Sequence, residues 1–158
     1  MKSLLTVVVA AGAALLLSSC SLLSGLGGSD RPTGEVSQSQ QVDAFSLKVG
    51  DCLISTDLGD SFSEVPLVPC SQAHDVEIIK IFDMADGAYS QDAIDEAAYQ
   101  CEAAIAEYVG PDWESTGLDW NRFSPTEGSW GKGDREIDCI AYTLSGELDL
   151  TASVKGIA

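Results

Sequence analysis

The sequence predicts an α+β fold in which one amphipathic helix packs on a small, mainly antiparallel sheet stapled by two disulfides. Three observations predict it: a helical apolar stripe within residues 90–109, strand-like segments within residues 75–82 and 135–154, and four cysteines after Cys20. The 158 residues are 45% hydrophobic, which is enough for the core of one compact domain. This composition excludes a wholly disordered acidic protein.

The N-terminal residues have the pattern of a lipoprotein signal peptide. Lys2 precedes an uncharged run from Leu4 to Leu17, which is too short for the ~20-residue helix that crosses a bilayer. The run ends in Leu-Ser-Ser-Cys, which resembles the lipobox of bacterial lipoproteins, where the cysteine thiol receives a diacylglyceryl group. We therefore expect residues 1–19 to be removed and Cys20 to be lipidated, with palmitate among the acyl chains. The alternative is an ordinary signal peptide with an unrelated cysteine.

Residues 20–43 are predicted to be a flexible, lipidated tether because Ser, Gly and Gln dominate them. About 24 such residues reach roughly 25–30 Å, so the globular domain at residues 44–158 should stay near the extracytoplasmic face of the cell membrane. The formal net charge of −17 excludes nucleic acid and an electrostatically held membrane surface as partners. We expect the N-terminal lipid to hold the protein at the membrane and the acidic charge to keep the domain soluble.

The first element predicted within the domain is a largely buried strand at Asp75–Phe82, which is short and rich in β-branched residues. A helix is predicted over Ser90–Val109, with Ser90 capping its start and Gly110 and Pro111 ending it. Its apolar stripe consists of Ile94, Ala97, Ala98, Cys101, Ala104, Ile105 and Tyr108.

Two further strands are predicted at Arg135–Leu144 and Glu147–Val154, joined by a tight turn at Ser145 and Gly146. In the second of these, apolar and polar residues alternate, so one face should be solvent-exposed. Together with the strand at Asp75–Phe82, they form the predicted sheet.

Four cysteines remain in the domain once Cys20 is assigned to lipid, and an even number in an exported domain predicts two disulfides. Three pairings are open. We favour Cys52 with Cys70 and Cys101 with Cys139, because Cys101 lies on the helical stripe and Cys139 lies in the middle of a strand. A zinc site formed by these thiols and His74 is the alternative, but no Cys-x₂₋₄-Cys spacing is present.

Three segments carry a family resemblance: Val49–Cys52, Val65–Glu77 and Ser124–Cys139, followed by an ending at Ser153–Gly156. Their ordered cysteines, His-Asp pair, tryptophan and Gly-Asp-Arg resemble the septum-formation domain of exported and membrane-anchored actinobacterial proteins. The resemblance spans most of residues 49–156. It implies association with the cell envelope or cell division, and no established enzymatic activity.

The candidate binding residues lie in these segments: His74, Asp75, Trp130, Asp134 and Arg135. His74 with Asp75, and with Asp134 or Asp138 as a further carboxylate, can form an acid–base dyad. The alternative is a histidine that bonds the loop backbone, which we favour because no nucleophile motif is present.

The glycine-rich loop after Trp130 also has two interpretations. Asp134 and Arg135 can hold a tight loop by an ion pair or by backbone hydrogen bonds. Alternatively, Trp130 stacks on a sugar or peptide and Arg135 binds a carboxylate.

The sequence therefore predicts a lipid-anchored, extracytoplasmic binding or interaction module of the cell envelope, associated with septum formation. We expect no catalytic residues, no cofactor and no metal, and an envelope protein or glycan as the partner. A small envelope hydrolase that uses His74 with Asp75 or Asp134 is the alternative.

Overall fold

The computed structural model describes residues 34, 36–56, 58, 62–147 and 149–158. These residues form a six-stranded antiparallel sheet with the strand order β1-β3-β2-β4-β6-β5. The strands are β1 (Gln40–Asp43), β2 (Cys52–Leu53), β3 (Glu64–Val68), β4 (Val76–Asp83), β5 (Leu118–Phe123) and β6 (Glu136–Thr143). The helices are α1 (Gln91–Ala98), α2 (Gln100–Tyr108) and α3 (Glu127–Trp130), with short 3₁₀ turns η1 (Ala44–Ser46) and η2 (Trp113–Thr116).

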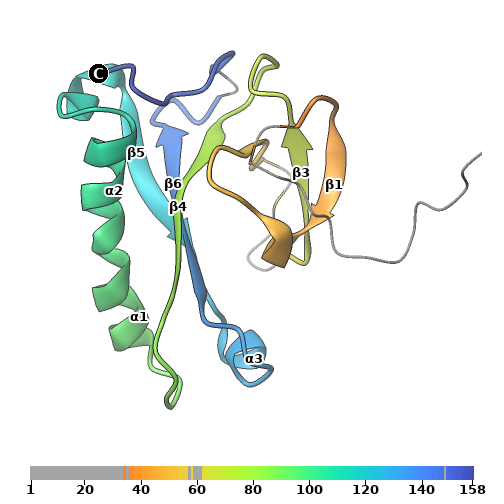
Figure 1. Ribbon diagram of the computed structural model, residues 1–158, viewed down its shortest axis with the longest axis vertical. Coiled ribbons are helices and arrows are strands. Elements are labelled where there is room, and N and C mark those ends of the chain that lie inside the picture. The colour runs from red at the N-terminus through yellow and green to blue at the C-terminus, as the bar shows by residue number, and fades with distance from the viewer. Residues whose placement is uncertain (1–33, 35, 57, 59–61, 148) are drawn as a thin grey trace, which may run out of the picture.

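One long helix covers one side of the sheet. It consists of α1 and α2, which meet at Tyr99 and run alongside β4, β5 and β6, whereas β1 and β3 lie beyond β4 (Figure 1). The predicted α+β fold class, with a helix on an antiparallel sheet and two disulfides, is confirmed.

Local sequence accounts for the position of the long helix. The Ser90 hydroxyl accepts a hydrogen bond from the Ala93 N–H, as predicted for the cap, and the stripe residues Ile94, Cys101 and Ile105 are fully buried against the sheet. The interruption at Tyr99 was not predicted, because the apolar stripe continues through it.

Both favoured disulfide pairings are present. Cys101–Cys139 joins α2 to β6, and Cys52–Cys70 joins β2 to the residues that follow β3. Because each bridge connects elements distant in sequence, it restricts the unfolded chain and stabilises the folded domain.

Side chains on the two faces of β6 belong to different hydrophobic clusters. Ile137, Cys139 and Ala141 belong to the core beneath the helix, whereas Ile140 belongs to a second core formed with β2, β3 and β4. This division follows from the alternation of side chains along a strand. The residues of β6 that point away from the helix therefore line the opposite face of the sheet.

The prediction of a strand at Glu147–Val154 is wrong. A turn forms one residue earlier than predicted, with Leu144 and Ser145 at its centre and the Gly146 N–H donating to the Thr143 carbonyl. Among the described residues beyond it, only Leu150 makes a bridge, and its partner is His74. The physical reason is that β4 and β5 already pair with the two edges of β6, so no edge remains for a hairpin partner.

The structure also contains four strands that the sequence analysis did not identify: β1, β2, β3 and β5. β1 lies within the segment assigned to the tether, where Val42 is buried in the second core. The folded part of the chain therefore begins before Ala44.

The C-terminal segment is held against β4 and α2. The fully buried Glu77 carboxylate accepts hydrogen bonds from the Tyr108 hydroxyl, the Ser153 hydroxyl and the Val154 N–H, each 2.7 Å long. Farther along, the Ala158 N–H donates to the Val109 carbonyl. Only glycine fits at position 110, because its φ is +130° and a Cβ there would overlap the Ala158 carbonyl.

Candidate functional site

A groove of about 780 Å³ lies on the sheet face opposite the long helix. Its floor is built by the residues of β6 that point away from the helix, and Glu127 and Ser129 of α3 contribute to its border. The described lining residues from β6 are Glu136, Asp138, Ile140, Tyr142 and Thr143.

Aromatic and apolar residues form the sides of this groove. Phe123 on β5 and Phe62 before β3 pack edge to face, with 4.9 Å between ring centres, and Phe45 and Tyr89 also line the groove. The groove therefore combines ring surfaces with the polar side chains of β6.

Three carboxylates line the groove at alternate positions: Glu136 and Asp138 lie in the first half of β6, and Asp134 lies two residues before it. Residues two apart on a strand share a face, so the sequence itself places these acids together. The Asp134 carboxylate accepts a hydrogen bond from the Glu136 N–H at 3.1 Å, which fixes its position.

Asp138 is the most buried acid of this row, with 6% of its surface exposed, and its Oδ1 atom has no hydrogen-bond partner. Burial raises the pKa of Asp138 to about 8, and the negative charges of Glu136 and Asp134 add to the effect. Burial also raises the pKa of Glu136, with contributions from Asp83 and Asp134. The site is therefore an anionic cluster whose members repel one another.

Cations do not balance this cluster within the described part of the groove. Arg122 is the one described lining residue with a positive charge, and its guanidinium group forms an ion pair with Asp95 on α1. The predicted residue Asp75 adds a fourth acid to the lining, and its carboxylate accepts hydrogen bonds from the N–H and hydroxyl of Ser55.

The other predicted site residues do not join Asp75 and Asp134 in the groove. His74 is fully buried, its Nδ1 atom lies 2.8 Å from the Gln72 carbonyl, and its Nε2 atom has no hydrogen-bond partner. Its backbone bridges to Leu150. The arrangement matches the structural interpretation of His74 and gives a dyad with Asp75 no access to the groove.

Trp130 and Arg135 stabilise their own loop. The Trp130 indole N–H donates to the Gly87 carbonyl at 2.9 Å, and the Arg135 guanidinium stacks 3.9 Å from the ring centre. Arg135 also donates to the Trp130 and Asp134 carbonyls and pairs with Asp86. With Trp130 only 7% exposed, its ring offers little surface for a ligand.

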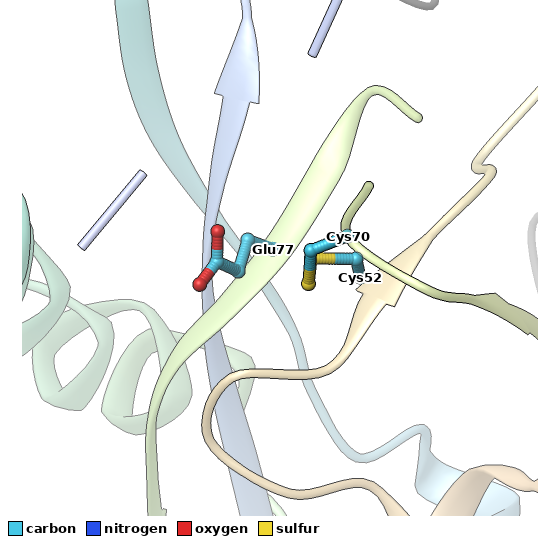
Figure 2. Close-up of side chains that lie close together, drawn as sticks. All are labelled: Cys52, Cys70 and Glu77. Carbon is cyan, nitrogen blue, oxygen red and sulfur yellow. A yellow bond between two sulfur atoms is a disulfide. The ribbon is translucent and has the colours of Figure 1, made fainter. Parts of the chain in front are cut away.

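The zinc alternative does not fit the thiols that the sequence offered for it. Cys52, Cys70 and Glu77 are the one group among the described residues whose ligand atoms lie within 4.8 Å of one another (Figure 2). However, the two sulfur atoms are bonded to each other, so neither is a thiolate, and the Glu77 carboxylate already accepts three hydrogen bonds.

Comparison with known proteins supplies one match. A protein-family model described as septum formation matches residues 12–147, which include the groove acids and all four domain cysteines. No curated protein and no solved structure matches the chain.

Proposed function

Because the chain belongs to the septum-formation family, we propose that it acts in septum formation as a binding module of the cell envelope, with the acidic groove as its ligand surface. The observation that carries this proposal is the buried, unpartnered carboxylate oxygen of Asp138 in the floor of the groove. Buried polar atoms in proteins are normally hydrogen-bonded, so an unpartnered carboxylate oxygen on a residue that lines a groove is suited to a ligand.

The proposed location is the extracytoplasmic face of the cell membrane, where Cys20 carries the lipid anchor. Cys20 and the signal peptide lie outside the described residues, so the support is the sequence pattern and the two disulfides, which are typical of exported domains. In the described ranges, no helix has the length and apolar character needed to cross a bilayer.

Binding is favoured over hydrolysis because the proposed dyad does not form a site. His74 lies outside the groove lining, while Asp75 and Asp134 lie within it and are held by Ser55 and by the backbone of Glu136. General acid–base chemistry requires the base within hydrogen-bond reach of the substrate. The fully buried His74 side chain has no such access.

Localisation in cells tests the proposal. We compare the wild-type protein, the groove variant Glu136→Gln/Asp138→Asn, and the control Glu96→Gln/Glu102→Gln, which replaces two carboxyl groups at exposed positions on α1 and α2. We expect antibody detection to show septal enrichment of the wild type and the control, and its loss for the groove variant, with all three in the membrane fraction.

A groove variant that is enriched at septa like the wild type would refute the role of the groove. A separate Cys20→Ala variant tests the anchor, because it should leave the membrane fraction and lose incorporation of a palmitate analogue. Proximity labelling from the wild type that returns cytosolic proteins would contradict the envelope location.

A further inference from the structure

Asp138 has apolar neighbours on both sides of its strand. In the register of the sheet it lies opposite Ile81 on β4 and Phe123 on β5, and Ile140 follows it on the same face of β6. The unpartnered Oδ1 atom therefore belongs to a side chain with apolar cross-strand neighbours on β4 and β5. A ligand that fits this position has one charged or polar end and an aliphatic or aromatic stem.

The negative charges around Asp138 favour a positively charged ligand. Asp134 and Glu136 share its face, Asp83 on β4 lies opposite Glu136, and Asp75 lines the same groove. The lining cation Arg122 is engaged by Asp95. A neutral sugar would leave the repulsion among these acids in place, whereas a positive group offsets it.

An organic cation fits better than a metal ion. Oxygen ligands of Ca²⁺ lie 2.3–2.6 Å from the ion, so two ligands of one ion approach within roughly 5 Å of each other. Asp134, Glu136 and Asp138 do not form such a group, since among the described residues only Cys52, Cys70 and Glu77 do. The acids are spread along a strand, which suits an extended ligand more than a single ion.

We propose that the groove binds an extended segment of a partner protein and that Asp138 receives the ammonium group of a lysine side chain. This inference rests on the proposed function, because it names the ligand chemistry of the same groove. The lysine stem packs on Phe123 and Ile140, and Glu136 and Asp134 supply the surrounding negative charge. The groove, at about 780 Å³, has room for more than one side chain.

The ammonium group replaces the proton that Asp138 carries in the empty groove. Lysine keeps its charge up to pH 10, whereas the ligand-free Asp138 ionises near pH 8. Affinity should therefore increase as the pH rises from 6 to 9. A ligand that bound the protonated carboxyl group as a hydrogen-bond donor would show the opposite trend.

The test is calorimetric titration of the full-length chain in detergent with an acetylated, amidated peptide of sequence Ala-Ala-Lys-Ala-Ala. The matched peptide carries norleucine in place of lysine, which keeps the stem and removes the charge. We expect the lysine peptide to bind about tenfold or more tightly than the norleucine peptide. We expect Asp138→Asn to abolish that difference, and Glu96→Gln/Glu102→Gln to preserve it.

Several outcomes would overturn the inference. These are equal binding of the two peptides, an unchanged preference in folded Asp138→Asn, displacement of the peptide by millimolar CaCl₂ with stoichiometric Ca²⁺ binding, or binding of amine-bearing cell-wall fragments without binding of the lysine peptide. The circular dichroism spectrum and thermal midpoint of each variant establish that it is folded. A wild-type protein that binds the lysine peptide but is not enriched at septa would refute the proposed role in septum formation and leave the ligand chemistry intact.

Discussion

Replacement of Asp138 by Asn should stabilise the domain, and the gain should depend on pH. The pKa of Asp138 is raised from 3.8 to about 8 in the folded state, chiefly by burial. The folded protein therefore holds a proton that the unfolded chain has released between pH 4 and pH 8. Because the unfolded state binds fewer protons in this window, the free energy of unfolding falls as the pH rises.

The size of the effect follows from the shift. One pKa unit corresponds to about 1.4 kcal/mol, so ionisation of Asp138 destabilises the fold by at most about 4 kcal/mol at pH 7. The contribution is fully favourable below pH 4 and is lost by the time the pH has passed 8. Asn has the same shape and no charge, so Asp138→Asn removes this dependence.

The assay is urea unfolding of wild type and variant at pH 4.5, 6, 7.5 and 9, with disulfides intact. The difference in unfolding free energy should grow by up to about 1.4 kcal/mol per pH unit and level off above pH 8. Carboxylates that do not interact with Asp138 affect both proteins equally and cancel in the difference. A constant difference across the series, or one that grows towards low pH, would refute the reasoning. The control Glu96→Gln/Glu102→Gln should differ from the wild type by an amount that does not change with pH.

Three other substitutions test how the fold is held together. Glu77→Gln replaces one accepting oxygen by an NH₂ group, which cannot accept a hydrogen bond from the three donors around Glu77. It should therefore lower the free energy of unfolding by about 2–4 kcal/mol and speed hydrogen exchange at the Val154 amide. A Val154 exchange rate equal to that of the wild type would contradict the role of Glu77. Replacing Cys101 and Cys139 together by Ser should cost about 4 kcal/mol, measured by urea unfolding against the wild type, and a cost under 1 kcal/mol would count against the bridge. Arg135→Lys keeps the positive charge but loses the planar group that stacks on Trp130, so it should lower the free energy of unfolding by about 1–2 kcal/mol. A thermal midpoint equal to that of the wild type would exclude a stabilising role for the stack.

The parts of the fold that the sequence predicts well are those with local signals. The cap at Ser90, the stripe through Cys101 and the β-branched run of β4 each act over a few residues, and the stripe also placed Cys101 opposite Cys139. β5 was missed because its sequence, Leu-Asp-Trp-Asn-Arg-Phe, contains two residues that favour turns, and its pairing with β6 supplies the stability.

The site was predicted less well because it depends on contacts distant in sequence. The sequence analysis noted Asp138 only as a further carboxylate, although Glu136 and Asp138 alternate within the strand predicted at Arg135–Leu144 and so share one face, and Asp134 directly precedes that strand. The groove forms because Phe45 and Phe62 pack beside that face of the sheet, and no local sequence pattern indicates this packing. His74 was singled out as a scarce residue type, but its surroundings show a buried structural histidine.

The Glu77 network has a consequence for the order in which the chain folds. Two of its three donors come from residues 76 and 77 positions later in the sequence, and the third from α2. Until Ser153 and Val154 arrive, closing the core around Glu77 would bury a carboxylate with most of its hydrogen bonds missing, which is strongly unfavourable. The domain therefore completes its fold only after nearly all of the sequence is present.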